Sequence, residues 1–245
     1  RNTVSPPTPE SNTPIGRARK GSLVDARPDD LAAFAVDAAL KQVPELDRAD
    51  IVDVVIGCGF PQEKQGMNLA RRVALLAGLP ASVPGTTVNR FCASSLQTIR
   101  MAFHAIRVGE GDVFVSAGVE CVSRYTGFGG AGVDPATTHN PRFAAAQARS
   151  QVYAETNRRW HDPRQEGQLP DIYLQMGQTA ENVATLCGVT RREQDEFAVL
   201  SQNRAEQAVK DGFYAREITP ISLPDGRVVD TDDGPRPGVT LEALS

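Results

Sequence analysis

Short β-branched runs alternate with helical segments through the first half of the sequence, and this alternation constrains the fold more than any other feature. Asp50–Gly59, Thr86–Arg90 and Asp112–Glu120 have the composition of buried strands. Segments with helical spacing of apolar residues separate them, and no hairpin turn joins one strand to the next. Strands connected through helices cross over and pair in parallel. The first half is therefore predicted to be an α/β unit with a mainly parallel sheet.

The second half has a different composition. Glycine and proline are frequent after Glu120, and the chain is predicted to be irregular to about Pro170. Two helices are then expected, one over about 176–186 and one from the capping box Thr190–Glu193 to Gly212. This half is predicted to be a helical, loop-rich insertion and not a second α/β unit.

Both ends of the sequence are expected to lack helices. The first 14 residues carry four prolines and no apolar periodicity, so residues 1–13 are predicted to form an irregular tail. From Ile218 to Ser245 the chain is expected to be extended, with a turn at the Pro-Asp-Gly of residues 224–226.

Charge and cysteine usage exclude several classes of protein. Net charge is −4 with no dense basic block, so nucleic acid is not an expected partner. No apolar run approaches the roughly 20 residues that a transmembrane helix needs, and no membrane association is expected. The four cysteines form no CxxC pair and have no histidine at metal-ligand spacing, which argues against a metal site and a disulfide framework. A reduced, cytoplasmic enzyme is the default expectation.

Cys92 is the residue with the clearest chemical potential. It is predicted to lie between a strand and the N-terminus of a helix, where unpaired N–H groups and the helix dipole stabilise a thiolate. The N–H groups of the first helical turn could also bind an oxyanion. Free cysteine is, however, among the most frequently buried residue types and often serves only as a small packed residue. Physics alone leaves both interpretations open.

Five stretches resemble one enzyme family, the thiolases. TVNRFCASSLQTI resembles the family's nucleophile segment, Val-Asn-x-x-Cys-x-Ser-Gly-Leu, with Ser95 in place of the glycine. SAGVECVSR resembles its Gly-x-Glu-x-Met-Ser segment, with Val122 in place of the methionine. TPIGRARKGSL, the long segment that begins MGQTAENVATLCG, and PRPGVTLEAL resemble the family's opening, its loop domain and the arm that follows. The resemblance extends from about Thr13 to the end of the sequence.

The resemblance implies a fold and a reaction. The α/β fold would comprise the N-terminal thiolase unit at 14–120, and a helical, loop-rich insertion (the loop domain) with the start of a return arm at 121–245. The implied activity is ping-pong acyl transfer, in which Cys92 carries the acyl group as a thioester while a 3-ketoacyl-CoA is cleaved or condensed. Coenzyme A and acyl-CoA would be substrates in lipid and fatty-acid metabolism, with no permanently bound cofactor. Half of a two-unit fold would expose a broad apolar face, so a homo-oligomer, either a dimer or a tetramer, is also expected.

Three further residues take candidate roles from the resemblance. Met176 corresponds to a loop-domain methionine that lines the acyl and pantetheine pocket. Gln175 stands where short-chain biosynthetic members often have histidine, which favours a degradative or broader-chain enzyme. Arg236 corresponds to an arginine near the nucleotide end of CoA, where a guanidinium can bind phosphate. Ala243 replaces a serine of some members, so that contact is not expected.

The family's other catalytic groups have no counterpart in this sequence. The resemblance implies an activating histidine in Gly-His-Pro, an Asn-Glu-Ala-Phe-type segment and a second cysteine in Cys-x-Gly-Gly, all from a C-terminal α/β unit that is absent here. An apolar first strand is also missing. Because these catalytic groups are not among its residues, the chain alone is expected to be inactive. It is either part of a functional thiolase or a truncated, non-catalytic paralogue that binds CoA or a partner. A ketoacyl synthase fits the loop-domain helices poorly.

Two other patterns receive structural interpretations. Gly127–Gly132 fits Gly-x-Gly-x-x-Gly, but no helix is predicted after it, so a flexible loop is favoured over a dinucleotide site. His104 lies 12 residues after Cys92 on the same predicted helix, and roughly 18 Å along a helix axis is too far for it to activate the thiol. His139 and His161 lie in predicted loops and are expected at the surface.

Overall fold

The computed structural model describes residues 11–125, 138–156 and 159–244. The glycine loop predicted at Gly127–Gly132 and most of the predicted N-terminal tail lie outside the described residues.

The described residues form two compact units. One consists of those within Arg1–Phe128 together with Gln207–Pro235, and the other of those within Gly129–Glu206 together with Arg236–Ser245. These units are defined by packing alone, and the predicted division of the chain at residues 13 and 120 stays a prediction.

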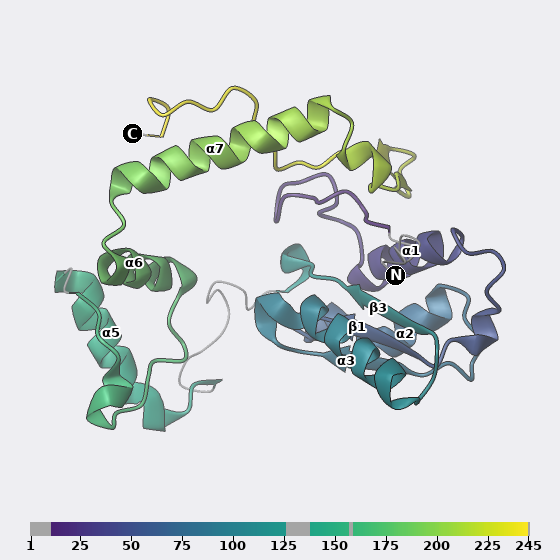
Figure 1. Ribbon diagram of the computed structural model, residues 1–245, viewed down its shortest axis with the longest axis horizontal. Coiled ribbons are helices and arrows are strands. Elements are labelled where there is room, and N and C mark those ends of the chain that lie inside the picture. The colour runs from purple at the N-terminus through teal and green to yellow at the C-terminus, as the bar shows by residue number, and fades with distance from the viewer. Residues whose placement is uncertain (1–10, 126–137, 157–158, 245) are drawn as a thin grey trace, which may run out of the picture. The chain divides into compact units, whose positions relative to one another are not determined.

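A three-stranded parallel sheet forms the centre of the first unit (Figure 1). β1 (Asp53–Gly57) lies between β2 (Gly85–Val88) and β3 (Phe114–Gly118). α2 (Leu69–Leu76) connects β1 to β2, and α3 (Ser94–Val108) connects β2 to β3. Both pairings are parallel, so the predicted parallel α/β unit is confirmed.

One face of this sheet is closed by α1 (Pro28–Leu40) and α2. α1 begins at Pro28 with Asp29 and Asp30 in its first turn, which favours a helix N-terminus. The apolar side chains that are fully buried on this face include Val54, Ile56, Leu69 and Val73, each 0 % exposed. Burying each of these side chains is worth roughly 1.5–3 kcal/mol, so this layer supplies a large share of the unit's stability.

The other face is covered by α3, and the packing there is different. The residues that α3 buries are small, namely Ser94, Thr98 and Ala102. Four large apolar residues of α3 are exposed; we call these the α3 stripe, and they are Leu96, Ile99, Phe103 and Ile106. The helical spacing of these four residues is confirmed, but their side chains are not part of the described core.

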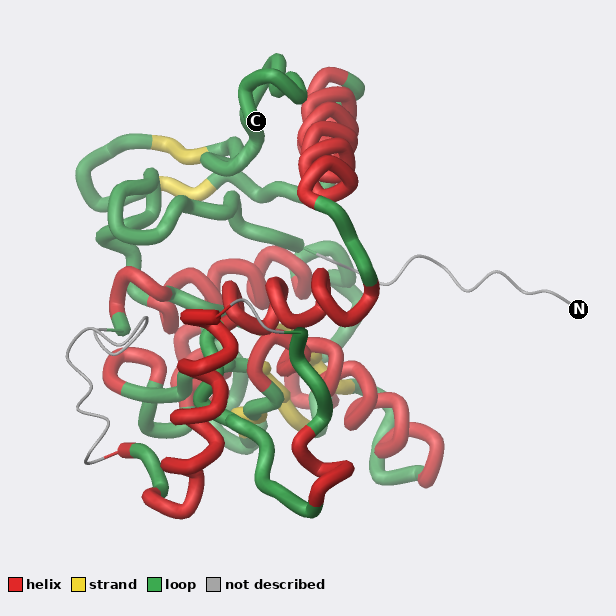
Figure 2. The backbone as a smooth tube through the Cα atoms, turned by 90° about the vertical axis from the view of Figure 1, so that its left-hand side faces the viewer, coloured by secondary structure: helices red, strands yellow, loops and turns green. Residues whose placement is uncertain are grey.

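The N-terminal segment of the first unit is held against a short hairpin. β4 (Ile221–Ser222) and β5 (Val228–Val229) pair antiparallel, and the predicted turn at 224–226 connects them (Figure 2). Asp233 follows the hairpin and accepts hydrogen bonds from the backbone N–H groups of Arg17 and Ser22, both at 2.8 Å. A small apolar cluster joins this layer to α1, formed by Leu23, Leu31, Ile221 and Val229.

Helices dominate the second unit. α6 (Met176–Cys187) ends at Gly188, whose φ is +70°, as a left-handed helix C-cap requires. α7 (Arg191–Lys210) begins at the predicted capping box, in which the Glu193 carboxylate accepts hydrogen bonds from the Thr190 N–H (2.7 Å) and hydroxyl (2.8 Å). Both predicted helices are therefore confirmed.

The prediction of an irregular chain up to about Pro170 is wrong in part, because α5 (Ala144–Thr156) lies within it. Only Ala146 of α5 is buried, so the helix carries no apolar stripe to reveal it. Its alanine-rich composition, with high helix propensity, was the available indication.

Short 3-10 helices complete the secondary structure of the described residues. They are η1 (Arg48–Asp50), η2 (Glu63–Gln65), η3 (Phe91–Ala93), η4 (Val122–Arg124), η6 (Pro141–Phe143), η7 (Pro163–Glu166) and η8 (Tyr214–Arg216). Within the described ranges no helix combines the length and the apolar character that crossing a bilayer requires.

Candidate active site around Cys92

Cys92 lies in η3, immediately before α3 begins at Ser94. β2 ends at Val88, so the thiol follows the carboxyl end of a parallel strand. The side chain is exposed and is a free thiol. Among the described residues, none accepts a hydrogen bond from the Cys92 N–H. An exposed thiol and an uncommitted N–H are therefore present at one position, at the N-terminus of a helix.

Two glycines allow the first turn of α3 to approach the sheet closely. A Cβ on Gly57, at the end of β1, would lie 2.5 Å from the Ser94 carbonyl carbon. A Cβ on Gly118, at the end of β3, would collide with the Ser95 hydroxyl. Side chains at either position would push α3, and Cys92 with it, away from the strand ends. The close packing of α3 on the sheet, and with it the position of Cys92, therefore depends on glycine at both positions.

A buried polar network supports the loops beside Cys92. The Glu120 carboxylate accepts hydrogen bonds from the Gly59 N–H and the Gln65 amide, both at 2.7 Å. The fully buried Gln65 also donates to the Phe60 carbonyl and accepts from the Cys121 N–H. This network ties the loop after β1 to the loop after β3. Sequence reasoning gave Gln65 no role, because a single polar residue in a loop forms no pattern.

The other cysteines are in different environments. Burial, together with the neighbouring Glu120 carboxylate, raises the pKa of the Cys58 thiol to about 12. Burial also raises the pKa of Cys121. Both thiols therefore stay protonated at neutral pH and are poor nucleophiles. Cys187, the last residue of α6, is the second exposed thiol.

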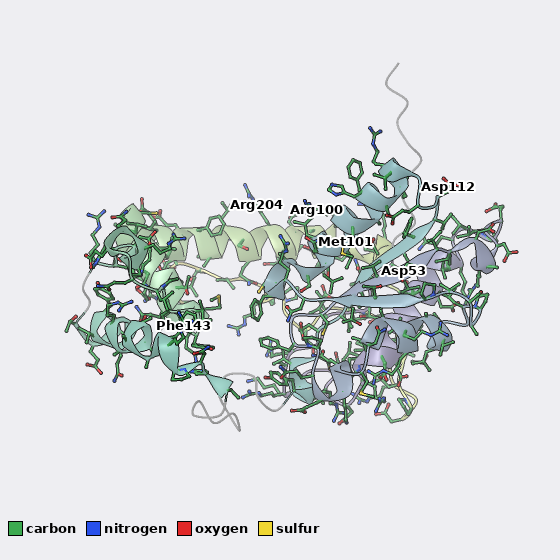
Figure 3. All side chains as sticks on the ribbon, turned by 90° about the horizontal axis from the view of Figure 1, so that it is seen from below. Asp53, Arg100, Met101, Asp112, Phe143 and Arg204 are labelled. Atoms are coloured by element: carbon green, nitrogen blue, oxygen red, sulfur yellow. The ribbon has the colours of Figure 1, made fainter. Side chains whose placement is uncertain are left out.

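A hollow of about 290 Å³ runs beside α3 in the first unit. Asp53 on β1 and Arg100 and Met101 on α3 line it, and Figure 3 labels all three. One carboxylate oxygen of Asp53 accepts from the Thr86 hydroxyl at 2.9 Å, while the other is buried with no hydrogen-bond donor among the described residues.

The other three predicted site residues belong to the second unit. Gln175 is the N-cap residue of α6, and its carbonyl accepts from the Thr179 N–H at 3.0 Å. Met176, the first residue of α6, is 70 % exposed. The N–H of Arg236 donates to the Gln202 side chain at 3.2 Å, and its guanidinium forms no ion pair with any described residue. Gln175 and Met176 are adjacent, whereas Cys92 is in the other unit.

A second hollow, of about 160 Å³, lies between α5 and α6. Tyr153, Trp160 and Asn182 are among its lining residues, and none of the predicted site residues is.

Among the described residues, no histidine forms a hydrogen bond with Cys92. His104 lies in the third turn of α3, and its ring packs against Phe103 with centroids 5.6 Å apart. His139 stacks on Tyr173, and the exposed His161 faces Glu166 at 3.2 Å. Over the ranges that the structure covers, no group of three or more potential ligands could hold a metal ion.

Comparisons with known proteins agree with the resemblance seen in the motifs. The family model described as the thiolase N-terminal domain matches residues 9–245. The chain is 39% identical to a beta-ketoadipyl-CoA thiolase of Acinetobacter baylyi over 95% of its length, and 40% identical to one of Pseudomonas aeruginosa, also over 95%. It is 36% identical to a 3-ketoacyl-CoA thiolase of Bacillus subtilis over 96% of its length.

The chain spans 56% of the length of each of these three relatives. The matched portion is the one that contains the parallel sheet, the exposed Cys92 and the helical unit described above. The chain belongs to the thiolase family and has the fold of that family's N-terminal domain.

Proposed function

We propose that Cys92 is the nucleophile of an acyl-CoA acyltransferase that acts on 3-ketoacyl-CoA thioesters. The observation that carries this proposal is the combination of an exposed thiol, an unbonded N–H on the same residue, and a helix N-terminus brought close to the sheet by Gly57 and Gly118. A thiolate at such a position is stabilised by the helix dipole, and the N–H can bind the oxygen of a tetrahedral intermediate.

The proposed reaction has two steps. The Cys92 sulfur attacks the 3-keto carbon, the bond between C2 and C3 breaks, and C2 takes up a proton to leave as acetyl-CoA. The sulfur of free CoA then attacks the acyl-cysteine and gives up its proton, which releases a shortened acyl-CoA and restores the Cys92 thiol. Condensation is the reverse sequence.

The second unit is proposed to hold the CoA thioester. Met176 is exposed at the start of α6, as a residue that lines an acyl and pantetheine pocket must be. The Arg236 guanidinium has no carboxylate partner among the described residues and is available to a phosphate. Gln175, in place of the histidine of short-chain biosynthetic members, favours a degradative or broader-chain enzyme. Relatives named for beta-ketoadipyl-CoA and 3-ketoacyl-CoA support a 3-ketoacyl-CoA as the substrate.

Coenzyme A and acyl-CoA enter this proposal as substrates, without a resident cofactor. A cytoplasmic location is part of the same proposal and is supported by four free cysteines, which are typical of a reducing compartment.

The first test is transfer of a single acetyl group. The 245-residue chain is incubated with acetyl-CoA, and each cysteine-containing peptide is examined by mass spectrometry. Acetyl on Cys92, lost in Cys92→Ala and retained in Cys187→Ala, is the expected result. Acetyl on Cys187 alone, or on no cysteine, would contradict the assignment of the nucleophile. CoA binding without any acetyl transfer would favour the alternative of a non-catalytic CoA-binding module.

The second test is turnover, followed by loss of the acetoacetyl-CoA enolate absorbance in the presence of CoA. The 245-residue chain alone is expected to give near-background rates, because the activating histidine and the second cysteine of the family are not among its residues. Loss of general acid–base help costs about 10²–10⁴ in rate and loss of one oxyanion donor about 10²–10³. The same chain joined to the remaining portion of the Bacillus subtilis relative is expected to turn over. Robust turnover by the chain alone, abolished in Cys92→Ala, would overturn the expectation of inactivity.

A further inference from the structure

The residue before Cys92 has an unusual backbone conformation. Phe91 has a φ of +44°, in the left-handed region that side chains with a Cβ rarely adopt. Phe91 is neither glycine nor one of the short polar residues that tolerate this region. Such a conformation persists only where the surrounding structure enforces it. Interactions that hold Phe91 in place therefore also determine how Cys92 is presented.

The hydroxyl of Ser94 makes two hydrogen bonds that span Cys92. It accepts from the Arg90 N–H at 2.8 Å and donates to the Phe91 carbonyl at 2.6 Å. We call this pair of bonds the Ser94 clip. Ser94 is 4 % exposed, so water does not compete for either bond. The clip joins the two residues before the thiol to the first turn of α3.

Neighbouring groups fix the clip on the sheet. The Ser94 backbone packs directly on Gly57, where no Cβ fits. The Asn89 side chain accepts from the Phe91 N–H at 2.8 Å, which restrains the turn from its other side. The Phe91 ring meets the Phe60 ring edge-on, with centroids 6.1 Å apart. Ser94 is thus buried and fixed on the sheet, whereas Cys92, which lies between the residues that the clip joins, is exposed.

The clip uses backbone groups of the two residues before Cys92 and none of Cys92 itself. The N–H groups of Arg90 and Phe91 and the carbonyl of Phe91 are all engaged, and the Cys92 N–H is left without an acceptor among the described residues. An N–H held in this way is available to a ligand.

We propose that Ser94 is a positioning residue for Cys92, whose buried hydroxyl holds Phe91 in its left-handed conformation and so presents the thiol and the N–H of Cys92 to the substrate carbonyl. This inference rests on the proposed function, in which Cys92 is the nucleophile. It assigns to Ser94 a role that acts through the backbone, without contact between Ser94 and the substrate.

The test compares Ser94→Ala with Ser95→Ala, because Ser95 is the adjacent serine, is exposed and makes no side-chain hydrogen bond with a described residue. The rate of Cys92 alkylation by iodoacetamide is measured relative to Cys187 in the same molecule, since both thiols are exposed. Acetylation of Cys92 by acetyl-CoA is measured in parallel. Labelling of the buried Cys58 and Cys121 reports any loss of folding.

Ser94→Ala is expected to slow both reactions of Cys92 about fivefold, the effect of moving a negative charge away from a helix N-terminus. Ser95→Ala is expected to change them less than twofold. Phe91→Gly should restore most of the loss when added to Ser94→Ala, because glycine adopts a positive φ without a clip. Equal rates in the wild-type chain and Ser94→Ala, with Cys58 and Cys121 still protected, would overturn the proposal.

If Ser94→Ala alone exposes Cys58 or Cys121, the comparison moves to the Phe91→Gly background. There, removal of the Ser94 hydroxyl is expected to have less than a twofold effect, because the strain that it opposes is gone. A fivefold slower reaction of Cys92 in that background would also overturn the proposed role of Ser94. If wild-type Cys92 takes up no acetyl group, the proposed function fails and the role of Ser94 with it. If it does and Ser94→Ala reacts equally fast, only the role of Ser94 is refuted.

Discussion

The two faces of the parallel sheet are packed in opposite ways. Against α1 and α2 the sheet buries large aliphatic side chains completely, and a hairpin adds a further layer outside α1. Against α3 it buries small residues, while the α3 stripe is exposed. A helix normally turns its largest apolar residues toward the core. From the reversed orientation of α3 we expect that its outer side packs against another surface, while its sheet side supports Cys92.

A matched pair of leucines tests this comparison most strongly. Leu69 on α2 is 0 % exposed and Leu96 on α3 is 69 % exposed. Leu69→Ala is expected to lower the free energy of unfolding by about 2–5 kcal/mol, and Leu96→Ala by less than about 0.5 kcal/mol. Urea unfolding of the two variants measures both values. Equal losses would show that the α3 stripe is buried in solution and that the two faces do not differ in this way.

Association is the second test, and it addresses the homo-oligomer expected from an exposed apolar face. An exposed stripe of four large apolar residues rarely stays uncovered, so light scattering at micromolar concentration is expected to show oligomers. Phe103→Asp should weaken the association about 10- to 100-fold, since burying such a side chain is worth about 1.5–3 kcal/mol. Phe197→Asp on α7, at a phenylalanine outside the stripe that is 70 % exposed against 59 % for Phe103, is the control. A monomeric wild-type chain, or dissociation caused by the control alone, would contradict this prediction.

A glycine at the end of β3 tests how closely α3 must approach. Gly118→Ala is expected to cost about 1–3 kcal/mol, because its Cβ would collide with the Ser95 hydroxyl. Ser95→Gly should relieve most of this cost when combined with Gly118→Ala. Gly177→Ala, where a Cβ would meet nothing within 4 Å, is the control. Thermal unfolding of the four variants measures these changes in stability. Additive effects of Gly118→Ala and Ser95→Gly would refute direct contact between positions 95 and 118.

The smallest expected effect concerns the outer layer on the closed side. Hydrogen bonds from the N–H groups of Arg17 and Ser22 lower the pKa of Asp233. The stability that these hydrogen bonds add to the folded state is therefore fully present above the ordinary aspartate pKa, near 3.9. It is lost as the pH falls through the lower pKa of the folded state. Asp233→Asn should cost about 1 kcal/mol or less at neutral pH and should remove this part of the acid sensitivity. An unchanged acid unfolding profile in Asp233→Asn would contradict the assignment, and Asp230→Asn, at an exposed aspartate of the same segment, is the control.

Local rules predicted much of this molecule from its sequence. The start of α7 at the Thr190 capping box and the end of α6 at Gly188 were predictable, because the hydrogen bonds involved are made within a few residues. The strands were recognisable from their β-branched runs, and the family was recognisable from the segment around Cys92. These features depend only on short stretches of chain.

Features that depend on distant partners were not predictable. The apolar spacing of Leu96 and Phe103 revealed a helix, but not which face of it meets the sheet. The left-handed Phe91 was not foreseeable either, because phenylalanine has no preference for that conformation. The roles of Gln175, Met176 and Arg236 stay predictions.

The hydrogen bonds from Ile15 to Asp232 and from Arg17 to Asp233 join residues that are 217 and 216 positions apart. At a synthesis rate of about 5–20 residues per second, the earlier residues leave the ribosome roughly 10–40 s before their partners exist. The N-terminal segment can form these hydrogen bonds only after the whole helical unit has been synthesised. Each doubling of such a loop costs only about 0.6 kcal/mol in closure entropy. Evolution can therefore lengthen or exchange the intervening segment at little cost in stability, while the delay before closure grows in proportion to its length.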